Sequence, residues 1–143
     1  AGKRWAALVL LLDVGRAAGL AALALAFLHA TWVPGIGLAL VAGNRFPLFH
    51  GFSGGKGVAS YLGFILPISP WGAAVSCLVW VAVNRIVRIP FIASFFMILT
   101  LGGAAIAANG GQVVSIAGTM AIVLLIVFSH KGNILSLIKA RKK

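Results

Sequence analysis

Acidic residues are almost absent from this sequence. Asp13 is the only one among 143 residues, which excludes paired-carboxylate catalysis and carboxylate-rich metal sites. Cysteine is equally scarce, because Cys77 stands alone in an apolar run and says nothing about a disulfide. No cysteine or acid lies at ligand spacing from the histidines, which argues against zinc; these are His29, His50 and His130.

Charged residues of either sign make up only 9% of the chain, whereas 62% of its residues are hydrophobic and the mean hydropathy is +1.11. A soluble domain carries about 25% charged residues, so the composition predicts an integral membrane protein. The net charge of +11 comes from basic residues that lie almost entirely at the ends of apolar segments. That pattern is typical of membrane proteins and predicts the lipid bilayer, rather than nucleic acid, as the partner.

The apolar runs predict an all-α, polytopic membrane helix bundle. Its segments cover about residues 5–28, 32–43, 58–84, 89–108 and 113–128, with a short amphipathic piece after them. The stretch 58–84 is interrupted by Pro67 and by the step Ser69-Pro70-Trp71. Two full spans need about 40 residues, so this stretch fits one tilted span or a hairpin of two short helices. Only the hairpin puts the basic segment ends on one side, so the positive-inside rule favours it and gives six segments.

Six segments bring several polar stretches to one face of the bundle, together with both ends of the chain. These are the loop after residue 46, Arg85 with Arg88, and the residues from His130 to Asn133. The positive-inside rule makes this face cytoplasmic. Within the first helix, Asp13 and Arg16 lie three residues apart and can pair; they are either functional or a self-neutralising pair. Small residues in the same helix predict stripes for close helix packing: Gly15 with Gly19, and Ala18, Ala22 and Ala26.

The polar interruption between residues 46 and 60 is rich in glycine and contains Lys56. Such a loop can turn its backbone N–H groups toward one point, and a helix that begins near Gly57 adds its positive end. A phosphate is the simplest ligand for this arrangement. The loop does not match a Walker A motif, because Gly51 to Gly55 is one residue too short and Gly57 follows the lysine. The alternative is an ordinary interfacial turn with a snorkelling lysine.

Three sequence patterns together resemble one enzyme family. Residues 52–60 read Phe-Ser-Gly-Gly-Lys-Gly-Val-Ala-Ser after Phe46-Pro47, a second pattern is His130 with Asn133 and Ile134, and a third runs from Leu11 to Arg16. They resemble motifs of the bacterial acyl-phosphate:glycerol-3-phosphate acyltransferases, the PlsY family. The resemblance extends over essentially the whole chain and implies a single membrane-embedded acyltransferase-like domain over residues 1–143.

The resemblance implies a seven-helix bundle with a cytoplasmic active site in the bacterial plasma (inner) membrane. Its activity would be transfer of a fatty acyl group from acyl phosphate to the 1-hydroxyl of glycerol 3-phosphate, giving lysophosphatidic acid for phospholipid synthesis. It implies no metal and no cofactor, and it makes the enzyme that forms acyl phosphate a candidate partner. The implied catalytic residues are His130, Asn133 and Lys56. The implied phosphate-binding residues are Ser53, Gly54, Gly55, Lys56, Gly57 and Ser60, with Asp13, Arg16 and Asn44 as candidates for supporting roles.

The chain also departs from the family pattern. The family's first helix and first motif are expected upstream of Ala1, so the resemblance implies an N-terminally truncated copy. Several positions differ from the usual motif residues, and these are Arg16, Asn44, Ser53, Arg88, Pro90, Phe91, Ser129 and Gly132. An inactive remnant or membrane scaffold is therefore an alternative reading. A small transporter is another, although few polar residues are available to face inward at mid-membrane.

Overall fold

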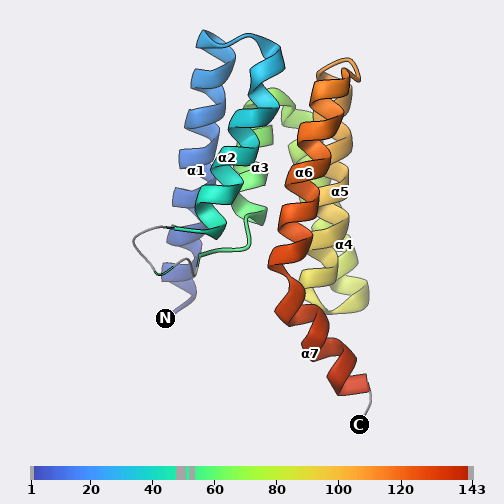
Figure 1. The fold of residues 1–143 in the computed structure, drawn as a ribbon. Helices are drawn as coiled ribbons and strands as arrows, with labels where there is room; N and C mark the ends of the chain where they lie inside the picture. The colour runs from blue at the N-terminus through green and yellow to red at the C-terminus, as the bar shows by residue number, and fades with distance from the viewer. Residues whose placement is uncertain (1, 48–50, 52–53, 142–143) are drawn as a thin grey trace.

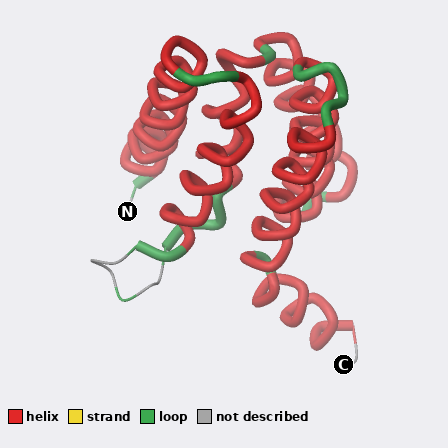
Figure 2. Tube along the Cα trace, turned by 45° about the horizontal axis from the view of Figure 1, so that its top comes forward, coloured by secondary structure: helices red, strands yellow, loops and turns green. Residues whose placement is uncertain are grey.

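The computed structural model describes residues 2–47, 51 and 54–141, and over these residues the chain is helical apart from short loops (Figure 1). The loops lie at the two ends of the bundle (Figure 2). The helices are α1 (Lys3–Phe27), the 3₁₀-helix η1 (Ala30–Trp32), α2 (Val33–Arg45), α3 (Val58–Ile68), α4 (Pro70–Val87), α5 (Pro90–Ala108), α6 (Val113–Ser129) and α7 (Lys131–Arg141).

Residues 58–84 form the predicted hairpin. Figure 1 shows α3 running away from the glycine loop and α4 returning beside α5. The break falls at Ser69, whose hydroxyl oxygen accepts a hydrogen bond from the N–H of Gly72 at 3.3 Å, while Pro70 occupies the first turn of α4. Pro67 does not interrupt the helix, since it lies inside the last turn of α3.

Within the described residues, three helices have the length and composition to cross a membrane: α1 from Arg4, α4 and α5. α6 and α7 make a fourth candidate if they are taken as one span with a 48° bend. α3 has only 11 residues, or about 16 Å of helix, which is half the thickness of a bilayer core. The six predicted segments are therefore all present, but two of them, α2 and α3, are short helices.

α3 is the central helix of the bundle and packs against α1, α2, α4 and α5. Its buried residues include Tyr61, Phe64 and Ile65. Gly63 allows α1 to approach closely, because a Cβ atom there would collide with the carbonyl oxygen of Val14. This contact sets the distance between the first helix and the centre of the bundle.

The prediction that the small-residue stripes on α1 pack closely against other helices is wrong for the contacts within this chain. Gly15 and Gly19 have open space around them, and Ala22 and Ala26 are exposed. The face of α1 that packs against the bundle instead contains Ala17, Ala21 and Ala24. Small residues occur all around this helix, so their spacing alone did not identify the packed face.

Candidate functional site

A polar pocket of about 330 Å³ lies at the end of the bundle that holds the glycine loop. Elements far apart in the sequence form it: the middle of α1, the end of α2, the glycine loop, and the first turns of α3, α5 and α7. We call it the polar pocket. Its lining residues are Asp13, Asn44, Gly55, Lys56, Gly57, Val58, Ala59, Pro90, Phe91, Ser94, His130 and Asn133.

The N-terminus of α3 lies at the polar pocket. Gly57 caps this helix in a left-handed conformation, with φ of 86°, and its carbonyl oxygen accepts the N–H of Tyr61 at 2.9 Å. The N–H groups of the first turn before Tyr61 therefore have no partner within the helix. They carry the positive end of the helix dipole, and the exposed Lys56 adds a full positive charge beside them. This end of α3 is suited to bind an anion.

Glycine is required where the loop passes the end of α2. The N–H of Gly54 donates to the carbonyl oxygen of Arg45 at 3.2 Å, and a Cβ atom on Gly54 would collide with the carbonyl oxygen of Asn44. A Cβ atom on Gly55 would lie 2.9 Å from Nδ2 of Asn44. The two glycines thus let the loop backbone lie directly against the last turn of α2.

A polar network connects α1 to the last turn of α2, against which this loop lies. The Nη2 atom of Arg16 donates to Oδ1 of Asp13 at 3.4 Å, as the sequence spacing predicts, and also to Oδ1 of Asn44 at 3.2 Å. The bond to Asn44 leaves the Nδ2 side of its amide facing Gly55. The three candidate supporting residues therefore form one network.

His130 is 2% exposed and lies at the junction of α6 and α7. Its Nδ1 atom is 2.8 Å from the carbonyl oxygen of Ile126. A carbonyl can only accept, so Nδ1 carries the hydrogen and Nε2 is the nitrogen available to other groups. Phe95 packs edge-on against the imidazole, with 5.3 Å between ring centroids.

Burial lowers the pKa of His130 below the usual histidine value, and the positive charge of Lys56 lowers that pKa further. The hydrogen bond to the carbonyl oxygen of Ile126 raises this pKa, but its effect is smaller than that of burial. The imidazole is therefore neutral at pH 7, with Nε2 as an acceptor.

Most of the predicted site residues meet in the polar pocket. Asp13, Asn44, Gly55, Lys56, Gly57, His130 and Asn133 line it, and Arg16 bonds to two of these residues. Gly54 lies in the loop beside the pocket without lining it, and Ser53 lies outside the described residues.

Ser60 does not fit its predicted place in the site. It is fully buried in the bundle and is not part of the lining of the polar pocket. Ser60 comes in the first turn of α3, where successive residues point about 100° apart, so a motif residue can be close in sequence and still face the core.

Sequence reasoning missed the contribution of α5. Pro90, Phe91 and Ser94 of this helix line the polar pocket. The sequence had placed Arg85 and Arg88, and with them the start of the segment 89–108, on the correct face of the bundle, but this did not identify the side chains that line the pocket. Arg85 and Arg88 are exposed at the same end and do not line the pocket.

A second, apolar cavity adjoins the polar pocket. It has a volume of about 340 Å³ and shares Val58 and Ala59 with the polar pocket. We call it the apolar groove. Its other lining residues come from α1, α3, α4 and α5 and are Leu10, Leu62, Cys77, Trp80, Val81 and Met97. The first turn of α3 thus separates a polar space from a hydrophobic one.

Together these features define a class: an all-helical membrane protein with a polar pocket built around a glycine–lysine loop at one end of its bundle. The family model described as glycerol-3-phosphate acyltransferase matches residues 1–140. The chain belongs to the glycerol-3-phosphate acyltransferase family.

Individual relatives agree with this assignment. The chain is 36% identical over 138 residues to the glycerol-3-phosphate acyltransferase of Laribacter hongkongensis, covering 96% of this chain and 64% of the relative. It is 35% identical over 159 aligned positions to the enzyme of that name from Neisseria meningitidis serogroup B, covering 98% and 72%. The chain therefore spans about two thirds of the length of these relatives.

Solved structures show the same fold. The crystal structure of PlsY (YgiH), an integral membrane glycerol 3-phosphate acyltransferase, in its glycerol 3-phosphate form matches with a TM-score of 0.87 at 32% identity, covering 98% of this chain and 70% of that one. Its lysophosphatidic acid form matches with the same TM-score and identity and is covered to 72%. The predicted membrane helix bundle is confirmed.

Proposed function

We propose that this protein transfers a fatty acyl group from acyl phosphate to the 1-hydroxyl of glycerol 3-phosphate and releases lysophosphatidic acid and phosphate, with residues 1–143 acting as one membrane-embedded domain. The observation that carries this proposal is the polar pocket, in which Lys56 and the N-terminus of α3 meet His130 and Asn133. Membership of the family supports it independently.

Both proposed substrates carry a phosphate, which the glycine loop suits. The free N–H groups of α3 and the ammonium of Lys56 bind phosphate oxygens, and Asn133 lines the same pocket. Gly54, Gly55 and Gly57 shape the loop. Asp13, Arg16 and Asn44 act as supporting residues, because their network joins α1 to the last turn of α2 beside the loop.

The reaction needs little more than positioning, because an acyl phosphate is already activated. The 1-hydroxyl oxygen of glycerol 3-phosphate forms a bond to the acyl carbon, and the bond from that carbon to the phosphate oxygen breaks. The electron pair leaves with the phosphate, and the hydroxyl proton ends on this phosphate, directly or through Nε2 of His130. Lys56 stabilises the charge that develops on the leaving group. No carboxylate base is required.

The apolar groove takes the acyl chain of the donor. It begins at Val58 and Ala59, so a carbonyl group held in the polar pocket has hydrophobic space directly behind the first turn of α3. Its lining is almost entirely hydrophobic, and burial of each methylene group there contributes about 0.8 kcal/mol. Phosphate and chain are thus bound by adjacent spaces of opposite polarity.

The placement in the membrane follows from the distribution of charge. The described basic residues outside α1 lie at the end of the bundle that carries the polar pocket, among them Arg45, Arg85, Arg88 and Lys131. By the positive-inside rule this end faces the cytoplasm, in the bacterial inner membrane. Soluble glycerol 3-phosphate would reach the pocket from that side, and the enzyme that forms acyl phosphate would deliver the donor there.

The test is an acyl-transfer assay on the purified natural full-length protein in lipid vesicles, with acyl phosphate and glycerol 3-phosphate as substrates and lysophosphatidic acid quantified by mass spectrometry. Lys56→Ala removes a charged hydrogen-bond donor, a loss of about 1.5–3 kcal/mol, and so we expect kcat/KM to fall about 10- to 160-fold. Lys131→Ala is the matched control. Its ammonium lies 4.6 Å from the centroid of the Phe128 ring, outside the polar pocket, so activity should stay close to that of the wild type.

Other results have distinct meanings. Normal turnover by Lys56→Ala would refute the site assignment while leaving the activity in place. A wild-type protein that binds both substrates without forming product would be a scaffold. Movement of substrate across the vesicle membrane without acyl product would indicate a transporter.

A further inference from the structure

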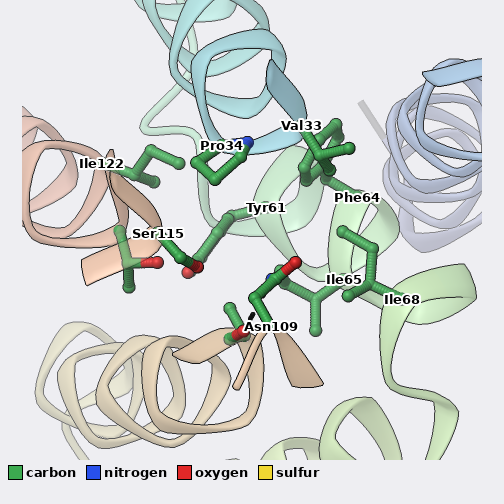
Figure 3. Close-up of a pocket in the computed structure, with 11 residues that line it drawn as sticks. Val33, Pro34, Tyr61, Phe64, Ile65, Ile68, Asn109, Ser115 and Ile122 are labelled. Atoms are coloured by element: carbon green, nitrogen blue, oxygen red, sulfur yellow. Dashed lines mark hydrogen bonds between the residues drawn. The ribbon is translucent and has the colours of Figure 1, made fainter. Parts of the chain in front are cut away.

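A small cavity lies at the opposite end of the bundle from the polar pocket, between α2, α3, α5 and α6 (Figure 3). Its volume is about 10 Å³. A single water molecule needs about 10–15 Å³ of such space. The cavity is therefore the size of one water, and too small for a larger ligand.

Two hydroxyl groups in this cavity lack partners. Tyr61 on α3 is 1% exposed and Ser115 on α6 is 3% exposed. Neither hydroxyl oxygen has a hydrogen-bond partner among residues 2–47, 51 and 54–141, although Thr119 also lines the cavity. Figure 3 shows the hydroxyl groups of Tyr61 and Ser115 turned to the same side of the cavity. A buried hydroxyl without a partner is costly, and such groups in folded proteins are normally satisfied by protein or by ordered water.

Asn109, which follows α5, supplies a third polar group. Its Nδ2 atom donates to the carbonyl oxygen of Ala105 at 2.8 Å. That bond leaves Oδ1 of Asn109 available as an acceptor at the same cavity. A buried water typically makes about three hydrogen bonds to polar groups of this kind.

We propose that one ordered water molecule occupies this cavity and bridges Tyr61 and Ser115. The phenol of Tyr61 donates to the water, which donates one hydrogen to Oγ of Ser115 and the other to Oδ1 of Asn109. The water satisfies both unpartnered hydroxyl groups and joins α3, α5 and α6 through one shared set of hydrogen bonds.

This water has a structural consequence for the polar pocket. The other ends of α3 and α6 carry Gly57 and His130, which line that pocket. A bridge between Tyr61 and Ser115 fixes the axial positions of the two helices relative to each other. The water is thus a positioning element far from the proposed chemistry, and its presence does not depend on the proposed reaction.

A crystal structure of the natural full-length protein at about 2 Å or better tests the proposal directly. We expect a spherical density peak within hydrogen-bond distance of the hydroxyl oxygens of Tyr61 and Ser115. A dry cavity with Tyr61 bonded directly to Thr119 would overturn the proposal.

Thermal unfolding of variants provides a second measurement. Tyr61→Phe and Ser115→Ala each remove one partner of the water, and each should lower Tm by about 2–4 °C. Because both act through the same water, the double variant should lose less than the sum of the two shifts. Ser136→Ala is the control, since this exposed serine donates only to the carbonyl oxygen of Gly132 within α7. Strictly additive shifts would contradict a shared water.

Discussion

Replacement of Gly57 by alanine is the sharpest test of how the glycine loop is built. Gly57 has φ of 86°, a left-handed conformation that costs a residue with a side chain about 1–2 kcal/mol. A Cβ atom there would also lie 2.8 Å from Cγ1 of Val41, which is fully buried. Forcing an extra carbon into a packed site costs about 1–3 kcal/mol. We therefore expect Gly57→Ala to lower the free energy of unfolding by about 2–5 kcal/mol, the sum of these two effects.

The two contributions can be separated with Val41→Ala. This second substitution removes the atom that the new Cβ would meet. In the Val41→Ala background, the cost of Gly57→Ala is therefore reduced to the backbone strain alone. The double variant should be more stable than the sum of the single losses predicts, by about the 1–3 kcal/mol of the steric term. The assay is unfolding in mixed micelles with increasing detergent denaturant, followed by circular dichroism.

Gly103→Ala is the matched control for this experiment. Gly103 lies in α5 with open space around it and an ordinary helical conformation, so alanine should be neutral or stabilise by up to about 1 kcal/mol. If Gly57→Ala and Gly103→Ala had the same effect, neither the strain nor the clash would exist as described. Additive losses for Gly57 and Val41 would reject the clash alone.

Three further predictions concern the helices around the polar pocket. Gly63→Ala should destabilise the bundle by about 1–3 kcal/mol because it forces α1 away, whereas Gly15→Ala should be neutral or mildly stabilising; the same unfolding assay checks both. The pKa of His130 is lower in the folded protein than in the unfolded chain. As the pH falls below about 6.5, the unfolded chain therefore binds a proton before the folded protein does, and the free energy of unfolding decreases. His130→Asn should flatten the fall in unfolding free energy between pH 7.5 and 5, and an unchanged slope would contradict this. Arg16→Gln should reduce kcat/KM about 2- to 12-fold by breaking its bond to Asn44, and Asn44→Ala should add little further loss in the double variant.

Much of the fold followed from the sequence because a bilayer imposes strong one-dimensional rules. Apolar length, the breaks at proline and glycine, and the placement of basic residues predicted the helices and the hairpin at residues 58–84, and the structure agrees with them to within a few residues. The same rules brought the glycine loop and His130 to one end of the bundle, where the polar pocket lies. These features depend on local chemistry and on topology, both of which can be read along the chain.

Side-chain direction was the information that the sequence did not contain. Ser60 belongs to the motif and faces the core, whereas Ser94 belongs to no recognised motif and lines the polar pocket. On α1, the small residues Gly15 and Ala17 look equivalent in sequence, yet only Ala17 packs against the bundle.

The sequence by itself therefore determined the membrane class, the order of the helices, and the presence of a glycine–lysine loop with a histidine on the same face. Only the tertiary structure decided which side of each helix is buried, that Arg16 bonds to Asn44 across 28 positions, and that a hydrophobic groove adjoins the polar pocket. The physical reason is that the rotation of a helix about its axis is set by contacts with its neighbours. Those contacts join residues far apart in the chain, such as Gly63 with Val14, and local sequence patterns do not encode them.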